Sequence, residues 1–136
     1  MTKKIRKQVG RNEKGCAKTW KSSLRGYVYI LVAGPFVKIG VTTSSDPYAR
    51  IKGIQTGCPF EVKPATRLEC YRINPFDVES YLHEVFSNLH VRGEWFMNEG
   101  GLKKLIKFCK GMNGGGPQIN GSGLLNKLIS DAGCYR

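Results

Sequence analysis

Two apolar segments separated by a tight turn constrain the fold of this chain more than any other feature. Residues 27–32, Tyr-Val-Tyr-Ile-Leu-Val, and residues 36–42, Phe-Val-Lys-Ile-Gly-Val-Thr, are rich in β-branched and aromatic side chains, a composition typical of buried strands. Between them, residues 33–35 read Ala-Gly-Pro, which is a turn sequence. The sequence therefore predicts an antiparallel β-hairpin at residues 27–42.

The length of the hairpin loop decides which side chains share a face of the sheet. If Ala33 and Gly34 form a two-residue loop, Tyr29 lies directly opposite Lys38, with their Cβ atoms about 5 Å apart. A three-residue loop would place Tyr29 and Lys38 on opposite faces. Pro35, beside the turn, leaves both registers open.

The next part of the chain predicts one short helix and one further strand. Asp46 is a suitable N-cap and Pro47 a suitable first helical residue, so a helix is expected from there to about Gln55. Residues 61–71 read as a third strand. Pro64 interrupts it early, which favours a position at the edge of the sheet.

Helical periodicity dominates the remaining sequence. Apolar residues recur at helical spacing in 75–89, 101–110 and 124–132, and three helices are expected there. Residues 111–123 are mostly glycine and polar residues, as in a flexible linker. The predicted fold is an α/β (α+β) domain, with a small three-stranded, mainly antiparallel sheet flanked by helices.

We expect three regions, which differ in charge. The chain carries 22 Lys and Arg against 10 Asp and Glu, a net charge of +12. Residues 1–25 hold nine of the cations and one acid and are predicted to be a flexible basic arm. Residues 26–110 form the main domain, and residues 111–136 the linker and a short C-terminal helix. Such an arm binds polyanions through counterion release, and its expected DNA contacts are Lys3, Lys4, Arg6 and Lys7. A merely solubilising tail is the alternative.

The sequence gives no indication of a membrane protein or of a disulfide framework. No apolar run approaches the roughly 18 residues of a transmembrane helix, and the first residues lack the apolar region of a secretory signal. We therefore expect a cytoplasmic protein. Five cysteines without a Cys-x-x-Cys pair favour free thiols, with a zinc site as the alternative.

Several motifs together resemble one nuclease superfamily. The strings Tyr27-Val-Tyr29 and Lys38-Ile-Gly40, followed by predicted helices that carry Arg50 and Glu79, resemble the signature of the GIY-YIG nucleases. Residues 55–59, the spacing Glu79-x-x-x-His83 and residues 93–96 resemble a bacteriophage and bacterial DNA-binding branch, with Lys-Ile-Gly in place of Tyr-Ile-Gly. The resemblance covers about residues 26–100 and implies a GIY-YIG-like fold.

This resemblance implies a Mg²⁺-dependent DNA endonuclease, with Mn²⁺ as an alternative ion. In that scheme Glu79 is the metal ligand, Tyr29 orients or activates the attacking water, and Arg50 holds the phosphate. A phenol has a pKa of about 10, so Tyr29 would need a neighbouring cation, and Lys38 is the candidate. Whether Lys38 acts on Tyr29, on a phosphate of the nucleic acid or on the water itself is left open. A carboxylate such as Glu79 suits Mg²⁺, which prefers oxygen ligands.

Other roles remain open at this stage. His83 is expected to orient a phosphate, protonate the leaving oxygen, bind metal or be structural, and Tyr27 to be a core residue or a nucleic-acid contact. Glu94 has two alternatives, pairing with a cation such as Arg50 or making a second acidic contact. The alternative functions are a non-catalytic DNA-binding module and a basic RNA-binding or assembly protein. The strandedness of the DNA and the oligomeric state are not predicted.

Overall fold

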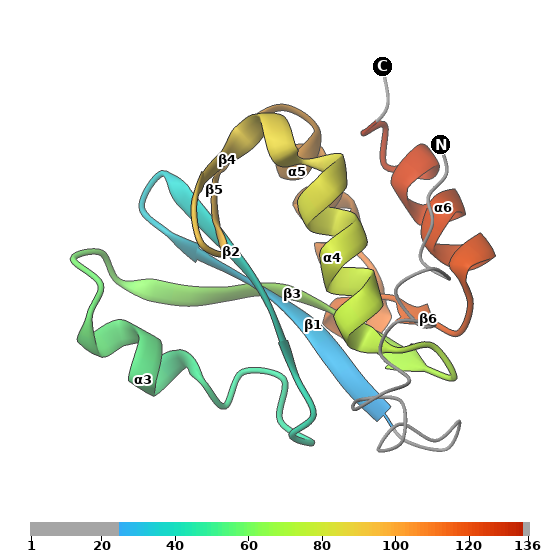
Figure 1. The fold of residues 1–136 in the computed structure, drawn as a ribbon, viewed down its shortest axis with the longest axis horizontal. Coiled ribbons are helices and arrows are strands. Elements are labelled where there is room, and N and C mark those ends of the chain that lie inside the picture. The colour runs from blue at the N-terminus through green and yellow to red at the C-terminus, as the bar shows by residue number, and fades with distance from the viewer. Residues whose placement is uncertain (1–24, 135–136) are drawn as a thin grey trace.

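The predicted hairpin forms the centre of the sheet (Figure 1). The computed structural model describes residues 25–134. In it, β1 (Arg25–Ala33) pairs antiparallel with β2 (Phe36–Thr42), and Ala33 pairs with Phe36. The loop is therefore Gly34-Pro35, and Gly34 adopts a φ of 62°, a left-handed conformation that glycine tolerates without strain.

This loop changes the predicted register by two residues. Tyr29 pairs with Gly40, and Lys38 pairs with Leu31, so the direct Tyr29–Lys38 pairing expected from an Ala33-Gly34 loop is wrong. Because the loop still has two residues, Tyr29 and Lys38 remain on the same face of the sheet, in a diagonal relationship.

Within residues 25–134 the sheet has six strands rather than the three predicted. β3 (Val62–Tyr71) pairs antiparallel with β1, and the strand order is β4-β5-β2-β1-β3-β6. The additional strands are β4 (His90–Arg92), β5 (Trp95–Met97) and β6 (Gln118–Ile119). The β3–β6 pair is parallel and the others are antiparallel. With only two or three residues each, the extra strands are too short to show a detectable alternation of apolar and polar residues.

Four α-helices complete the described part of the chain, which makes the fold α+β. They are α3 (Ile51–Thr56), α4 (Pro75–Val85), α5 (Gly100–Lys110) and α6 (Ser122–Asp131). Single 3₁₀ turns lie at Ser87–Leu89 and Asn113–Gly115. None of the helices in residues 25–134 has the length and apolar character needed to cross a bilayer.

Helix α3 begins later than its capping sequence predicts. The Asp46 carboxylate accepts a hydrogen bond from the Tyr48 N–H at 2.9 Å, and the Asp46 carbonyl accepts one from the Ala49 N–H at 3.2 Å. These bonds form turns through residue 50 and delay the first helical residue to Ile51. Aspartate favours such local turns because its short side chain bonds to nearby N–H groups.

The sheet separates two unequal apolar cores. The larger core lies on the face covered by α4, α5 and α6, and Val28, Ile39 and Leu82 are completely buried in it. The smaller core lies on the opposite face, where Tyr29 and Leu31 pack with residues of α3. Figure 1 shows α3 well apart from the three helices of the larger core. The face that carries Tyr29 is therefore only partly covered.

The glycine-rich segment after α5 is part of the folded sheet rather than a linker. The Thr66 hydroxyl donates to the Gly115 carbonyl at 2.7 Å, and the Glu69 N–H donates to the Pro117 carbonyl at 2.9 Å. These bonds hold the segment beside β3, where β6 then pairs. Arg25, the last residue of the predicted arm, begins β1. The rest of the arm, including its DNA contacts Lys3, Lys4, Arg6 and Lys7, lies outside the described residues.

Candidate active site

The outer edge of β2 is paired by β5 over only part of its length. β5 pairs with Phe36, Val37 and Lys38. At the next residue, Ile39, the N–H donates to the Glu94 carbonyl at 3.0 Å, and the carbonyl lies 3.1 Å from Nε2 of His83 on α4. A carbonyl only accepts hydrogen bonds, so this histidine nitrogen carries the proton. Side chains of α4 can therefore reach β2 beyond the end of β5.

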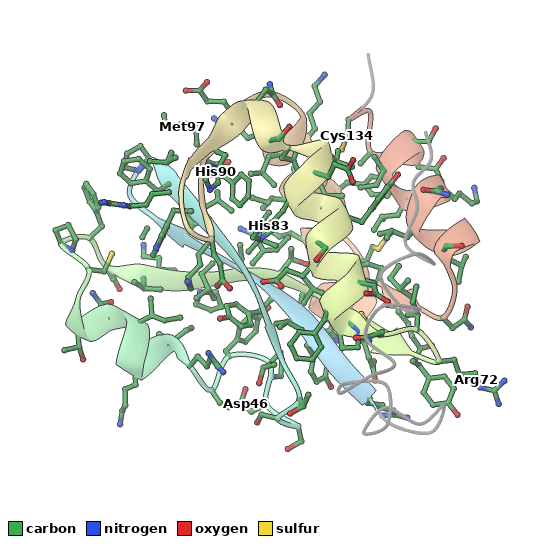
Figure 2. All side chains as sticks on the ribbon, viewed as in Figure 1. Asp46, Arg72, His83, His90, Met97 and Cys134 are labelled. Atoms are coloured by element: carbon green, nitrogen blue, oxygen red, sulfur yellow. The ribbon has the colours of Figure 1, made fainter. Side chains whose placement is uncertain are left out.

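The start of α4 explains how this helix is positioned. The Asn74 side chain caps it by accepting from the Phe76 N–H at 2.9 Å, and Pro75 occupies the first helical position, an arrangement that favours helix initiation. Glu79 and His83 then lie one turn apart, with Glu79 Oε2 3.8 Å from His83 Nε2. Figure 2 shows His83 between α4 and the sheet.

Tyr29 occupies the space that Gly40 leaves free. A Cβ atom on residue 40 would overlap the ring and hydroxyl of Tyr29, so glycine is required there for the phenol to lie against β2. The side chain of Tyr29 is only 2% exposed. The positive charge of Arg50, at the N-terminal end of α3, acts on the phenol and lowers its pKa.

The environment of Tyr29 favours its protonated form. Burial is the largest cause that raises the pKa of the phenol, the negative charges of Glu94 and Glu79 raise it further, and Arg50 opposes them. Arg50 is the cation whose charge lowers the pKa of the phenol, and an action of Lys38 on Tyr29 stays a prediction. Lys38 forms an ion pair with Glu94, its Nζ 2.9 Å from Oε1.

Two carboxyl groups from distant parts of the sequence meet at this site. Glu79 on α4 shares a hydrogen bond with Glu94, which lies in the turn between β4 and β5. Burial, the charge of Glu94 and this hydrogen bond raise the pKa of Glu79 to about 7, while Lys38 lowers it. Oε2 of Glu79 is buried and has no hydrogen-bond partner among residues 25–134. An unpaired buried carboxylate oxygen is unfavourable unless a cation or donor approaches it.

These carboxylates fit the ligand requirements of Mg²⁺. The ion is commonly held by one or two protein carboxylates and completes its octahedron with water and substrate oxygens. Glu79 and Glu94 provide such a pair, and the unpartnered Oε2 of Glu79 is the atom best suited to a first contact. Nε2 of His83 is occupied by the Ile39 carbonyl. Within residues 25–134, no three His, Cys, Asp or Glu side chains converge as a metal site, so an ion here would need oxygens from water or substrate.

The structure brings most of the predicted site residues together. We call the following group the polar cluster: Tyr29, Lys38, Arg50, Glu79, His83 and Glu94. Tyr27 lies on the same face of β1 but packs against Arg67 of β3, whose guanidinium carbon is 5.9 Å from the ring centroid. The sequence reasoning missed the steric role of Gly40 and left Glu94 with two alternatives. In the structure Glu94 pairs with a cation, which is Lys38 rather than Arg50, and it also makes the second acidic contact, with Glu79.

Comparisons with known proteins give one match. No curated protein and no solved structure matches the chain. Residues 26–112 match the T5orf172 domain, a range that includes the whole polar cluster. This match overturns the resemblance to the GIY-YIG superfamily, because T5orf172 is a different family and no comparison supports GIY-YIG. Since the match covers more than half of the 136 residues, the chain belongs to the T5orf172 domain family.

Proposed function

We propose that this protein is a metal-dependent DNA endonuclease whose active site is the polar cluster. The observation that carries the proposal is the contact between the carboxyl groups of Glu79 and Glu94 in a chain of net charge +12. A protein that only binds a polyanion has no need of two carboxylates beside its cations, because they repel phosphate. A divalent cation between carboxylates and phosphate removes this repulsion.

The proposed substrate follows from charge and family. Membership of the T5orf172 domain family points to nucleic-acid binding at a coarse level. The excess of Lys and Arg supports the same class of partner, since cations that neutralise phosphates release counterions from DNA. Hydrolysis of a phosphodiester adds water across a P–O bond, leaving a phosphate on one product and a hydroxyl on the other.

Each residue of the polar cluster has a role in this scheme. Arg50 is exposed and can bind a phosphate through two N–H groups. Tyr29, held protonated by burial, orients water or a phosphate oxygen through its hydroxyl rather than acting as a base. Glu79 and Glu94 would hold Mg²⁺ or Mn²⁺, and such an ion would supply Lewis-acid chemistry at the phosphate and an activated water.

Lys38 and His83 have supporting roles in this scheme. Lys38 balances the charge of Glu94 through the 2.9 Å ion pair, and its ammonium group could also bind a phosphate oxygen of the substrate. His83 anchors α4 to β2 through the Ile39 carbonyl. Because that bond occupies Nε2, His83 is a positioning residue for Glu79 rather than a proton donor to the leaving oxygen.

A cleavage assay with matched variants tests the proposal. Single-stranded, duplex and branched DNA are incubated with wild type or Glu79→Gln in Mg²⁺, Mn²⁺ or EDTA. Cleavage should require the metal and be lost in Glu79→Gln, while DNA binding in EDTA is retained. Glu61→Gln, which changes a carboxylate with 76% side-chain exposure, is the control and should cleave like wild type.

A non-catalytic DNA-binding module is the second candidate. The observation that favours it is the burial of Tyr29, since a phenol with a raised pKa is a poor base at neutral pH. DNA binding by wild type without cleavage of any substrate in either metal would establish the module and overturn the nuclease proposal.

A further inference from the structure

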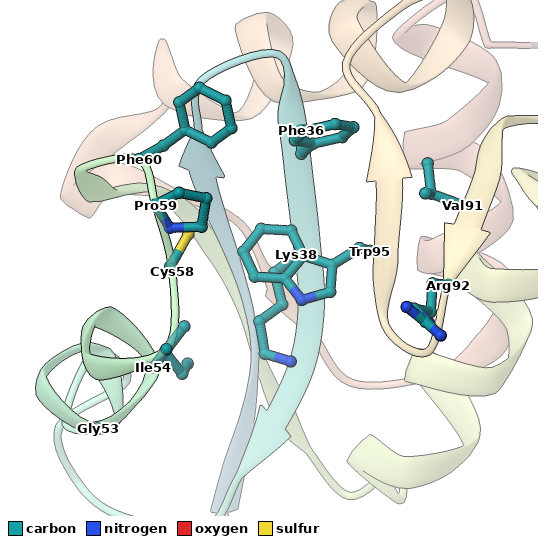
Figure 3. A pocket seen from close by; sticks show the side chains of 11 residues that line it. Phe36, Lys38, Gly53, Ile54, Cys58, Pro59, Phe60, Val91, Arg92 and Trp95 are labelled. Atoms are coloured by element: carbon teal, nitrogen blue, oxygen red, sulfur yellow. The ribbon is translucent and has the colours of Figure 1, made fainter.

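A pocket of about 580 Å³ adjoins the polar cluster (Figure 3). It lies between the segment that joins α3 to β3 and the strands β2, β4 and β5. Lys38 lines the pocket and also contacts Glu94 in the polar cluster. The two sites are therefore adjacent and share one cation.

Aromatic rings from three separate elements line this pocket. They are Phe36 of β2, Trp95 of β5 and Phe60 just before β3. Phe36 and Phe60 are in contact at 5.9 Å between ring centroids, and Phe60 is 39% exposed. Figure 3 shows the ring of Trp95 lying over β2, beside Lys38. These three aromatic side chains give the pocket surfaces on which a flat ring can pack.

The positive charges that line the pocket favour flat ligands that carry a negative charge. Lys38 and Arg92 line it, and no acidic residue is among the described residues that do so. Lys38 Nζ already lies 5.4 Å from the centroid of the Trp95 ring, which makes that aromatic surface more electropositive. An aromatic pocket bordered by two cations suits an aromatic ring joined to an anion, which is the chemistry of a nucleotide.

We propose that this pocket receives one unpaired base of a single DNA strand, whose phosphate then reaches the polar cluster. The inference rests on the proposed function and adds the class of substrate. A base inside a duplex has both faces covered by its neighbours, so only an unpaired or flipped-out base can stack on Trp95 or Phe60. The volume is within the roughly 300–1,000 Å³ of small-ligand pockets, ample for a single base. Lys38, shared by both sites, links the bound base to the cleavage chemistry.

Binding measured without cleavage tests this inference. The protein is titrated in EDTA with a twelve-residue oligothymidylate and with the same strand lacking its two central bases. The base-free positions keep their phosphates, so this strand separates stacking from charge. We expect the complete strand to bind more tightly and Phe60→Ala to weaken it by roughly 5- to 100-fold, as for removal of one stacked base. Phe108→Ala removes an equally exposed ring, 38% against 39%, from α5 and should bind like wild type.

A spectroscopic signal reports directly on Trp95. The chain has two tryptophans, so Trp20→Phe leaves Trp95 as the sole indole. The complete strand should quench its fluorescence, and the strand without central bases should quench it much less. Circular dichroism confirms that Phe60→Ala and Phe108→Ala are folded.

The outcomes separate this inference from the nuclease proposal. Equal affinity for the two strands, or an equal decrease of affinity in Phe60→Ala and Phe108→Ala, would overturn the base pocket even if Glu79-dependent cleavage is observed. Preferential binding of the complete strand with quenching of Trp95 would support the pocket even if no DNA is cleaved. Tighter binding to duplex than to single-stranded DNA would also overturn the pocket.

Discussion

Tyr29 lies directly opposite Gly40 in the β1–β2 pair, and its phenol fills the space that a side chain at residue 40 would occupy. This relationship brings the hydroxyl of Tyr29 to Arg50 and close to the charges of Glu79 and Glu94. The backbone at residue 40 could accept any amino acid, but the Tyr29 ring leaves room only for glycine there. The position can be tested with the smallest possible side chain.

Gly40→Ala should displace the Tyr29 ring and destabilise the protein. Overpacking of this kind costs about 1–3 kcal/mol, which denaturant unfolding measures directly. DNA cleavage should fall as well, because the phenol loses its position beside Arg50. Gly123→Ala is the control, since a Cβ there meets nothing within 4 Å and alanine favours the helix. If both variants unfold like wild type, the ring is not confined as described.

The free energy of unfolding should depend on pH through Glu79. Its pKa rises from 4.5 to about 7 on folding, so between these values the folded protein retains a proton that the unfolded chain has released. Stability therefore falls as pH rises from 4.5 to 7, by up to about 3 kcal/mol, and stays reduced above that range. Glu79→Gln removes this dependence and should melt on the order of 10 °C higher than wild type at pH 8 without metal.

The effect of Mg²⁺ on the melting temperature is an independent test of the role of Glu79. Mg²⁺ at pH 8 should raise the melting temperature of wild type, because an ion that binds only the folded state stabilises it. The same ion should leave Glu79→Gln unchanged. Glu61→Gln should follow wild type in both the pH series and the Mg²⁺ series. Parallel pH profiles for wild type and Glu79→Gln would show that Glu79 does not titrate in this range.

Arg50→Ala should lower cleavage without unfolding the protein. Removal of a group that stabilises developing charge on phosphate reduces the rate by about 100-fold or more. Arg50 is exposed, so the free energy of unfolding should change by no more than about 0.5 kcal/mol. Lys52→Ala removes an exposed cation two residues away and should stay within about twofold of wild type. Equal rates for the two variants would exclude a specific role for the guanidinium.

Deletion of residues 1–21 should weaken DNA binding and reduce its salt dependence. The segment carries eight Lys and Arg and one Glu. Each phosphate that the shortened protein no longer neutralises should lower the slope of log affinity against log salt by about 0.9 for duplex DNA. Affinity measured between 50 and 200 mM salt gives this slope. An unchanged slope would show that the arm does not bind phosphate.

The long elements of the fold could be predicted from sequence, and the short ones could not. β1, β2 and β3 span seven to ten residues, enough for composition and turns to reveal a strand. The helices α4, α5 and α6 span ten or eleven residues and show helical periodicity. β4, β5 and β6 depend on partners that the fold brings to them, so no local pattern marks them.

The site was predictable in its members but not in its contacts. Any two-residue hairpin loop places Tyr29 and Lys38 on the same face of the sheet. Which residues they pair with depends on whether the loop is Ala33-Gly34 or Gly34-Pro35. Glu94 lies in the short connection between β4 and β5, and its neighbours are set by how that hairpin docks on β2. Both the ion pair with Lys38 and the contact with Glu79 are therefore tertiary in origin.

The parallel pairing of β6 with β3 has a practical consequence for recombinant work. The family match ends at residue 112, but Ile119, Leu125, Leu128 and Ile129 lie beyond it and are buried in the larger core. A fragment trimmed at that boundary would leave the end of β3 unpaired and expose the apolar surface that α6 covers, both of which promote aggregation. An expressed or fused version needs the segment through residue 134 to remain monodisperse.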